Sequence, residues 1–164
     1  PVIRKQLANG LAQNIKEFFP ETELVAGTAT AGIPHAAWVS DILELPMVYV
    51  RSKAKEHGRG NQIEGKYTAG QKVVVVEDIV STGGSSITAV EALRAAGCEV
   101  VGVVCVYTYN LPKAEEAFDA AGVKYVSLTN FDYLVEAANE SGTISQDQIP
   151  FLKEWHAKLK AGEL

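Results

Sequence analysis

The sequence has 164 residues, a length that fits one domain with a single hydrophobic core. With 47% hydrophobic and 21% charged residues it has the composition of an ordinary globular protein, and no apolar run approaches the roughly 20 residues that span a bilayer. The net charge of −5 argues against nonspecific binding to nucleic acid.

The predicted elements alternate between helix and strand along the chain. Helical periodicity predicts helices at residues 2–19, 33–43, 84–96, 112–121, 133–139 and 146–160. Short apolar runs between them predict strands at residues 24–27, 47–50, 72–76, 100–107 and 125–128. This order predicts an α/β fold: a single doubly wound domain, with a mainly five-stranded parallel sheet flanked by helices.

A few residues of reactive type are interpreted as structural. Cys98 and Cys105 lack metal-ligand spacing and lie in or beside an apolar strand, so they are expected to be reduced core residues. Together with the absence of a basic-then-apolar leader, they favour a cytoplasmic protein without a membrane anchor. Lone histidines and tryptophans on helices are interpreted as surface, packing or interface residues: His35, His156, Trp38 and Trp155.

The run from residue 73 to residue 86 is the most informative segment. Four valines predict a buried parallel strand, and Glu77 and Asp78 follow where that strand is expected to end. The loop 81–85 contains only Ser, Thr and Gly and precedes a helix, whose first N–H groups can bind an anion. An ordinary capped turn is the alternative, but two adjacent acids repel each other without a ligand or metal. The segment therefore favours a ligand with both hydroxyl and phosphate groups, bound at the carboxyl end of the sheet.

This run resembles the signature of the type I phosphoribosyltransferases, which bind 5-phosphoribosyl 1-pyrophosphate (PRPP). Residues 49–58, which include Arg51-Ser52-Lys53-Ala54-Lys55-Glu56-His57-Gly58, are similar to the mobile loop of the orotate phosphoribosyltransferases within that family. Residues 26–34 are similar to the pyrophosphate loop of the same enzymes. The three segments occur in the order found in the family, and the resemblance covers essentially the whole chain.

The resemblance implies transfer of a phosphoribosyl group from PRPP to orotate in pyrimidine biosynthesis. Asp78, Lys55 and His57 take the catalytic roles it implies, and Ser81 touches orotate. The implied PRPP-binding set is Arg51, Lys55, His57, Glu77, Asp78, Ile79, Val80, Ser81, Thr82, Gly83, Gly84 and Ser85. The implied pyrophosphate loop is Thr28, Ala29, Thr30, Ala31 and Gly32.

The chemistry of these residues suits PRPP. The loop 81–85 can cradle the 5-phosphate, while Glu77 and Asp78 can accept hydrogen bonds from the ribose hydroxyls. Arg51 can bind the pyrophosphate through two hydrogen bonds. Mg²⁺ is expected on substrate oxygens and water, without a dedicated protein cage.

Residues 51–70 interrupt the alternation of helix and strand. Twenty mostly polar residues without apolar periodicity are long for a connection inside a compact domain. A solvated β-hairpin arm or a disordered loop is one interpretation, and a cationic active-site lid is the other. The family resemblance favours the lid and implies that it reaches the active site of the neighbouring subunit in a homodimer.

The sequence also departs from the family pattern. Ala31 and Ser52 stand where many members have basic residues, and residues 107–109 read Tyr-Thr-Tyr where many members place an orotate-binding arginine. The family's N-terminal segment, which closes over the base pocket, has no counterpart in these 164 residues. Some bacterial members share the substitutions, which indicates a sub-branch of the family.

Three other functions remain as alternatives. A phosphoribosyltransferase for another base shares the PRPP signature, although the Lys-x-Glu-His-Gly loop at 55–58 argues against a purine enzyme. A PRPP-sensing regulator normally carries a nucleic-acid-binding surface, which this acidic chain lacks. A catalytically silent core retains only affinity for PRPP.

Overall fold

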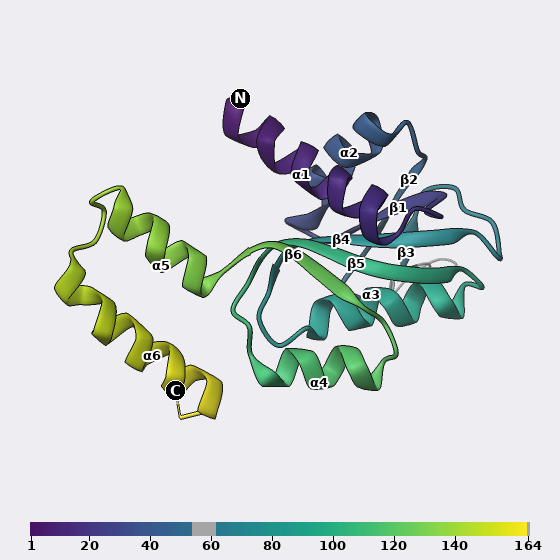
Figure 1. Ribbon diagram of the computed structural model, residues 1–164. Coiled ribbons are helices and arrows are strands. Elements are labelled where there is room, and N and C mark those ends of the chain that lie inside the picture. The colour runs from purple at the N-terminus through teal and green to yellow at the C-terminus, as the bar shows by residue number, and fades with distance from the viewer. Residues whose placement is uncertain (54–61, 164) are drawn as a thin grey trace.

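The computed structural model of the chain describes residues 1–53 and 62–163 (Figure 1). Its elements in chain order are α1 Val2–Phe18, β1 Leu24–Thr28, α2 Gly32–Leu43, β2 Met47–Val50, β3 Ile63–Glu64, β4 Lys72–Val80, α3 Gly84–Ala95, β5 Glu99–Thr108, α4 Pro112–Ala120, β6 Tyr125–Asn130, α5 Phe131–Glu140, the 3-10 turn η1 Gln146–Gln148 and α6 Ile149–Ala161.

The strands form one sheet in the order β3-β2-β1-β4-β5-β6. All neighbouring strands run parallel except β3, which pairs antiparallel with β2 at the edge. The prediction of a parallel sheet of five strands is confirmed. The strand β3 was not predicted, and it lies within the 51–70 segment, of which residues 54–61 are outside the described part of the chain.

Helices cover both faces of the sheet (Figure 1). On one face α1 and α2 pack on a core of Leu11, Ala12, Ile15, Phe19, Val25, Ala36, Val39, Val74, Val76 and Val104. On the other face the core includes Leu24, Ala26, Val75, Ala89, Val90, Leu93, Val103, Ala114 and Phe118, contributed by the sheet, α3 and α4. Alternate residues of β4 therefore serve opposite cores, as expected for a strand buried on both sides.

The strand β4 continues four residues beyond its predicted end at Val76 and runs to Val80. The prediction that Glu77 and Asp78 follow the strand is therefore wrong. The physical reason is the neighbouring strand β5, which is also longer than predicted and pairs Glu77 with Cys105 and Val80 with Thr108. Backbone pairing thus holds both acidic residues in the sheet.

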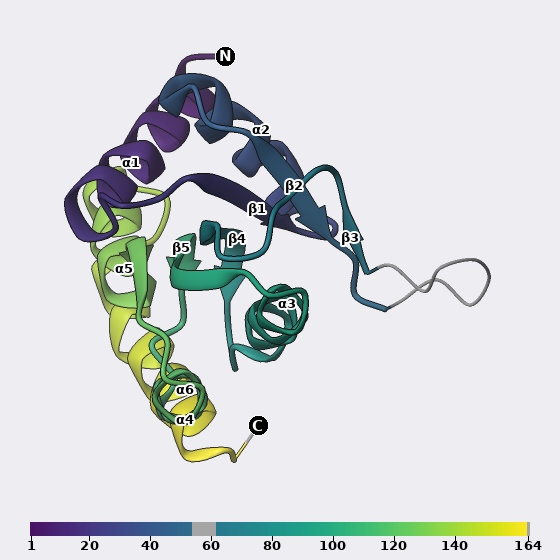
Figure 2. The same ribbon diagram turned by 90° about the vertical axis from the view of Figure 1, so that its right-hand side faces the viewer.

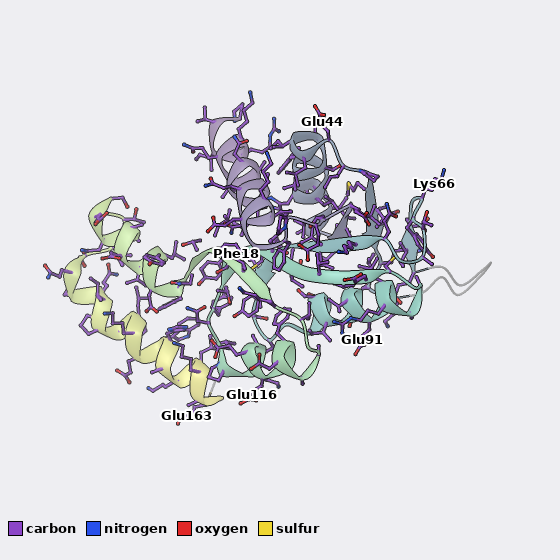
Figure 3. The ribbon with its side chains drawn as sticks, turned by 45° about the vertical axis from the view of Figure 1, so that its right-hand side comes forward. Phe18, Glu44, Lys66, Glu91, Glu116 and Glu163 are labelled. Atoms are coloured by element: carbon purple, nitrogen blue, oxygen red, sulfur yellow. The ribbon has the colours of Figure 1, made fainter. Side chains whose placement is uncertain are left out.

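The helices α5 and α6 lie to one side of the sheet beyond β6, as Figures 1 and 2 show. The helix α5 begins at Phe131, two residues before its predicted start, because the Asn130 side chain accepts hydrogen bonds from the N–H groups of Asp132 and Tyr133. Charged side chains point outward around the molecule, among them the labelled Glu44, Lys66, Glu91, Glu116 and Glu163 (Figure 3).

The two cysteines are buried and free, as predicted. Burial raises the pKa of the Cys105 thiol to about 12, so this side chain stays protonated and packs as an apolar residue.

Candidate active site

Glu77 lies at the centre of the site, between the end of β1 and the start of α3. Its side chain is only 4% exposed. One carboxylate oxygen accepts a hydrogen bond of 2.5 Å from the Thr28 hydroxyl, and the other accepts bonds of 2.9 Å and 3.2 Å from the hydroxyls of Ser85 and Ser86. Protein hydroxyls thus bind both carboxylate oxygens of Glu77. The predicted contact of Glu77 with a ribose hydroxyl stays a prediction.

Burial raises the pKa of the Glu77 carboxyl above its ordinary value. The Thr28 hydroxyl opposes this shift, the neighbouring Asp78 side chain adds to it, and the Ser85 hydroxyl again opposes it. The Thr28 and Ser85 contacts therefore offset part of the cost of burying a negative charge in the sheet. Ser86 was not among the predicted site residues, since its position beneath Glu77 is fixed only by the tertiary structure.

Asp78 is half-buried, whereas Glu77 is buried, so Asp78 is the acidic residue that a ligand can reach from solvent. Its charge acts on His35 in the first turns of α2: burial lowers the pKa of His35, and Asp78 opposes this shift. The Nδ1 atom of His35 is buried and has no hydrogen-bond partner among residues 1–53 and 62–163. His35 is therefore a packing residue within the electrostatic reach of the site.

The predicted phosphate loop is in the expected place, between β4 and α3. Ser81 and Thr82 are exposed, Val80 is buried in the core, and Ile79 is 46% exposed. Gly83 has a φ of 82°, a left-handed conformation that favours glycine, and it turns the chain into α3. The N-cap residue Gly83 has no side chain, and no other side chain in the described part of the protein caps α3. Its first N–H groups are oriented for an anion, and the positive end of the helix dipole favours one there.

The predicted pyrophosphate loop connects β1 to α2. Thr30 and Ala31 are exposed, whereas Thr28 and Gly32 are buried. A Cβ atom on Gly32 would lie 2.6 Å from the Val76 carbonyl oxygen and against the Thr28 hydroxyl. Only glycine therefore allows α2 to begin this close to the end of β4.

Arg51 follows β2 and forms an ion pair of 3.7 Å with Glu64 on β3. Its backbone N–H also donates to the Gln62 carbonyl oxygen. The side chain of Arg51 is about one-third exposed (38%) and lines a pocket with residues from two other segments. The predicted residues Lys55 and His57 lie outside the described residues.

That pocket has a volume of about 140 Å³ and brings three predicted segments together. Its lining consists of Thr28, Ala29, Val50, Arg51, Ser52, Gly84, Ser85, Thr88 and Ala89. The pyrophosphate loop, the residues after β2 and the start of α3 meet here because parallel strands end at one edge of the sheet. The pocket joins a cation to a helix N-terminus, which is an arrangement suited to phosphate groups.

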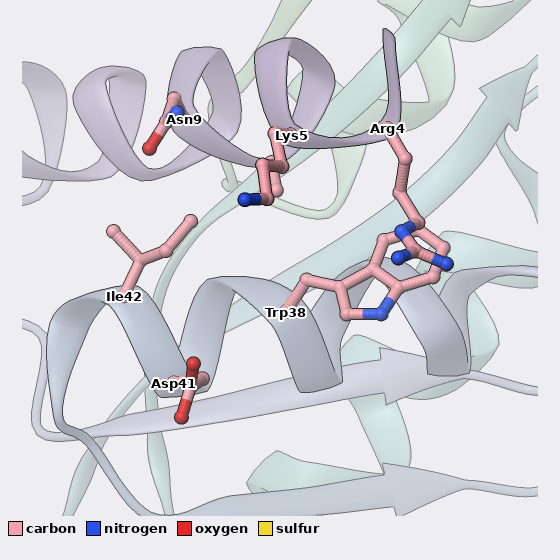
Figure 4. Close-up of a pocket in the computed structure, with 7 residues that line it drawn as sticks. Arg4, Lys5, Asn9, Trp38, Asp41 and Ile42 are labelled. Carbon is pink, nitrogen blue, oxygen red and sulfur yellow. The ribbon is translucent and has the colours of Figure 1, made fainter. Parts of the chain in front are cut away.

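A second pocket lies between α1 and α2, away from this edge (Figure 4). Arg4, Lys5, Asn9, Trp38, Asp41 and Ile42 line it. The Arg4 guanidinium lies 5.2 Å from the ring centre of Trp38, so the basic group is already engaged with the aromatic ring.

Within residues 1–53 and 62–163, no three side chains of His, Cys, Asp or Glu gather as they would around a metal ion. None of the helices described is both long enough and apolar enough to cross a bilayer.

Comparisons with known proteins agree on one family. The family model of the phosphoribosyl transferase domain matches residues 3–135. The orotate phosphoribosyltransferase of Listeria monocytogenes (serotype 4b) is 58% identical over 155 residues, which cover 94% of this chain and 74% of the relative. The enzyme of the same name from Bacillus subtilis is 58% identical, with 94% and 72% covered.

Solved structures give the same result. The UMP synthase of Leishmania donovani has a TM-score of 0.81 and 25% identity, with 96% of this chain and 34% of that chain covered. The orotate phosphoribosyltransferase of Aeropyrum pernix has a TM-score of 0.71 and 28% identity, with 82% and 74% covered.

Proposed function

Because this chain belongs to the orotate phosphoribosyltransferase family, we propose that it transfers the 5-phosphoribosyl group of PRPP to orotate, giving orotidine 5′-phosphate and pyrophosphate. The observation that carries the proposal is the pocket in which Thr28 and Ala29, Arg51, and Gly84 and Ser85 meet. Each segment offers groups suited to one end of PRPP.

The phosphate groups of PRPP fit the two ends of this pocket. The uncapped first turn of α3, with the exposed Ser81 and Thr82 beside it, can hold the 5-phosphate through backbone N–H groups. The pyrophosphate would lie along residues 28–32, with Arg51 and the loop residues Lys55 and His57 as its cations. Arg51 would have to exchange Glu64 for the pyrophosphate, which carries more charge than one carboxylate.

Asp78 carries the proposed catalytic role. As the bond to pyrophosphate breaks, positive charge develops on the ribose, and a half-exposed carboxylate at the end of β4 would stabilise that charge. Glu77 would help to position Asp78, because its hydrogen bonds fix the end of β1 relative to the start of α3.

We also propose that Mg²⁺ accompanies PRPP, held mainly by substrate oxygens and water. This hard cation prefers oxygen donors, and the site can supply them from Asp78 and from the hydroxyls of the two loops. When bound, the ion offsets the negative charge of the leaving pyrophosphate.

The homodimer and the lid are further proposals, supported by the resemblance of residues 49–58. In a dimer with shared sites, residues 51–70 would close over the partner subunit's PRPP. Mixing a Lys55→Ala/His57→Ala variant with Asp78→Asn would then create one complete site in each heterodimer. Random exchange would restore about a quarter of wild-type activity. Proven exchange without any activity would reject the shared site.

The proposed reaction is tested by measuring pyrophosphate release from PRPP and Mg²⁺ with orotate, adenine, xanthine or uracil as acceptor. Of the four acceptors, only orotate is expected to give pyrophosphate release. Release with another base would identify a different phosphoribosyltransferase. PRPP binding without release for any of the bases would indicate a silent core or a sensor.

A further inference from the structure

His156 connects the outlying helix α6 to the carboxyl end of the sheet. It is 4% exposed, although its neighbours on α6 face solvent. Its Nε2 atom lies 2.6 Å from the carbonyl oxygen of Tyr109, which follows β5. Its ring stacks on Phe131, with 4.0 Å between the ring centres. A protonated Nε2 can donate to this carbonyl, so one side chain joins α6 to the loop after β5.

The contact continues from Tyr109 into the site. The Tyr109 N–H donates a hydrogen bond of 3.1 Å to the carbonyl oxygen of Val80, the last residue of β4. Val80 directly precedes Ser81, where the phosphate loop begins. Two hydrogen bonds, one to the carbonyl oxygen of Tyr109 and one from its N–H group, therefore link α6 to the start of that loop.

Aromatic side chains occupy the same edge of the sheet. Tyr107 pairs with Ile79 across β4 and β5, one residue beyond Asp78. The rings of Tyr107 and Tyr109 meet edge to face, with 5.0 Å between their centres. Both rings are half-buried, and the Ile79 side chain is 46% exposed. This edge thus presents an apolar, aromatic surface next to the proposed ribose site, which suits a planar ring.

Tyr107 also remains a hydrogen-bond donor over the whole physiological pH range. Burial raises its pKa to about 12, and the nearby Tyr109 and Asp132 add to the shift. A neutral phenol donates to a carboxylate, which is the charged group of a planar acid such as orotate.

We propose that His156 is a positioning residue for the acceptor base: through the Tyr109 carbonyl it holds the Tyr107–Tyr109 pair as one wall of the acceptor site. The inference rests on the proposed function, because the acceptor is assigned there. It adds a residue on α6, outside the 3–135 range of the family model, to the machinery of the reaction. A purely structural His156 would anchor α6 without favouring either substrate.

Two substitutions separate these roles. His156→Phe keeps a ring to stack on Phe131 and removes the donor, whereas His156→Gln keeps an N–H donor of similar reach. The exposed Lys153 on the same helix supplies the control Lys153→Gln. Loss of one hydrogen bond predicts a rise of about tenfold in the KM for orotate in His156→Phe. The KM for PRPP should stay unchanged, and His156→Gln should resemble the wild type.

Tyr109→Leu covers the case in which His156→Phe fails to fold. This variant keeps the carbonyl that His156 contacts and removes one ring of the wall, so it should show the same loss confined to orotate. Equal changes in both KM values, or wild-type kinetics in His156→Phe and Tyr109→Leu, would overturn the proposal.

Hydrogen exchange tests the connection without relying on activity. The Tyr109 amide should exchange faster in His156→Phe than in the wild type, with His156→Gln close to the wild type. Unchanged exchange in His156→Phe would reject the connection. The variants could show this exchange pattern while the wild type has no orotate-dependent activity. In that case the proposed function would fail, and with it the acceptor role of His156. The link from α6 to the loop after β5 would stand.

Discussion

The Thr28 hydroxyl donates a 2.5 Å hydrogen bond to the Glu77 carboxylate, which joins residues 49 positions apart in the sequence. Thr28 begins the pyrophosphate loop, and Glu77 also accepts hydrogen bonds from Ser85 and Ser86 at the start of α3. One buried carboxylate therefore fixes the spacing between the two loops that are proposed to hold the opposite ends of PRPP.

Thr28→Val tests the hydrogen bond between Thr28 and Glu77, because valine keeps the shape of threonine and removes the hydroxyl. The free energy of unfolding should fall by about 1.5–3 kcal/mol, the usual contribution of a hydrogen bond to a charged group. Urea unfolding measures the change. Thr30→Val is the matched control on the exposed part of the same loop and should stay within about 0.5 kcal/mol of the wild type. Equal losses in the two variants would show that the hydroxyl of Thr28 contributes nothing specific.

Glu77→Gln tests the direction of the Glu77 pKa shift. A carboxyl whose pKa is raised by folding binds more protons in the folded state between its ordinary value of 4.5 and its folded value. Within that window the free energy of unfolding falls as the pH rises. Glutamine does not titrate, so the stability of the wild type relative to Glu77→Gln should decline from pH 4 upward. Urea unfolding of both proteins across this range measures it, and a relative stability that increased with pH would mean that the hydroxyls outweigh burial.

The sequence was sufficient to predict the parallel sheet and the meeting of the loops at one edge. Apolar runs and helical spacing identify β1, β2, β4, β5 and β6, and strands that run parallel bring their carboxyl ends together. The sequence did not reveal that Glu77 faces Thr28, because the direction of a side chain at a strand end depends on where the strand stops. The strand β3 was also missed, since two residues carry too little periodicity to be recognised.

The contribution of His156 lay equally beyond sequence reasoning. A lone histidine on a terminal helix gives no sign that its partner is the Tyr109 carbonyl, 47 residues earlier in the chain. Ser86 is a similar case, since it belongs to the site only through the position of Glu77.

Gly32→Ala tests the close approach of α2 to β4. The added methyl group would overlap the Val76 carbonyl oxygen and the Thr28 hydroxyl, so the loop must move. A loss of about 1–3 kcal/mol in the free energy of unfolding is expected, together with weaker PRPP binding. Gly84→Ala is the steric control, because a Cβ atom there meets nothing within 4 Å. Denaturation curves should show the loss in Gly32→Ala alone, and equal stability of the two variants would contradict the predicted overlap.

Asp78→Asn tests the proposed role of the half-buried acidic residue. Turnover should fall by about 100-fold, because the charge is needed most in the transition state. The affinity for PRPP, measured by calorimetry, should change much less. Asp119→Asn on the exposed surface of α4 controls for the loss of a charge alone. Unchanged turnover with weaker binding would make Asp78 a simple ribose ligand.

A crystal structure of the protein with PRPP and Mg²⁺ would test most directly whether one edge of the sheet holds all three parts of PRPP. The expected density places the 5-phosphate at the first turn of α3, the ribose hydroxyls beside Asp78, and the pyrophosphate along residues 28–32 near Arg51. PRPP bound in the pocket between α1 and α2, with none at the start of α3, would contradict the proposed site.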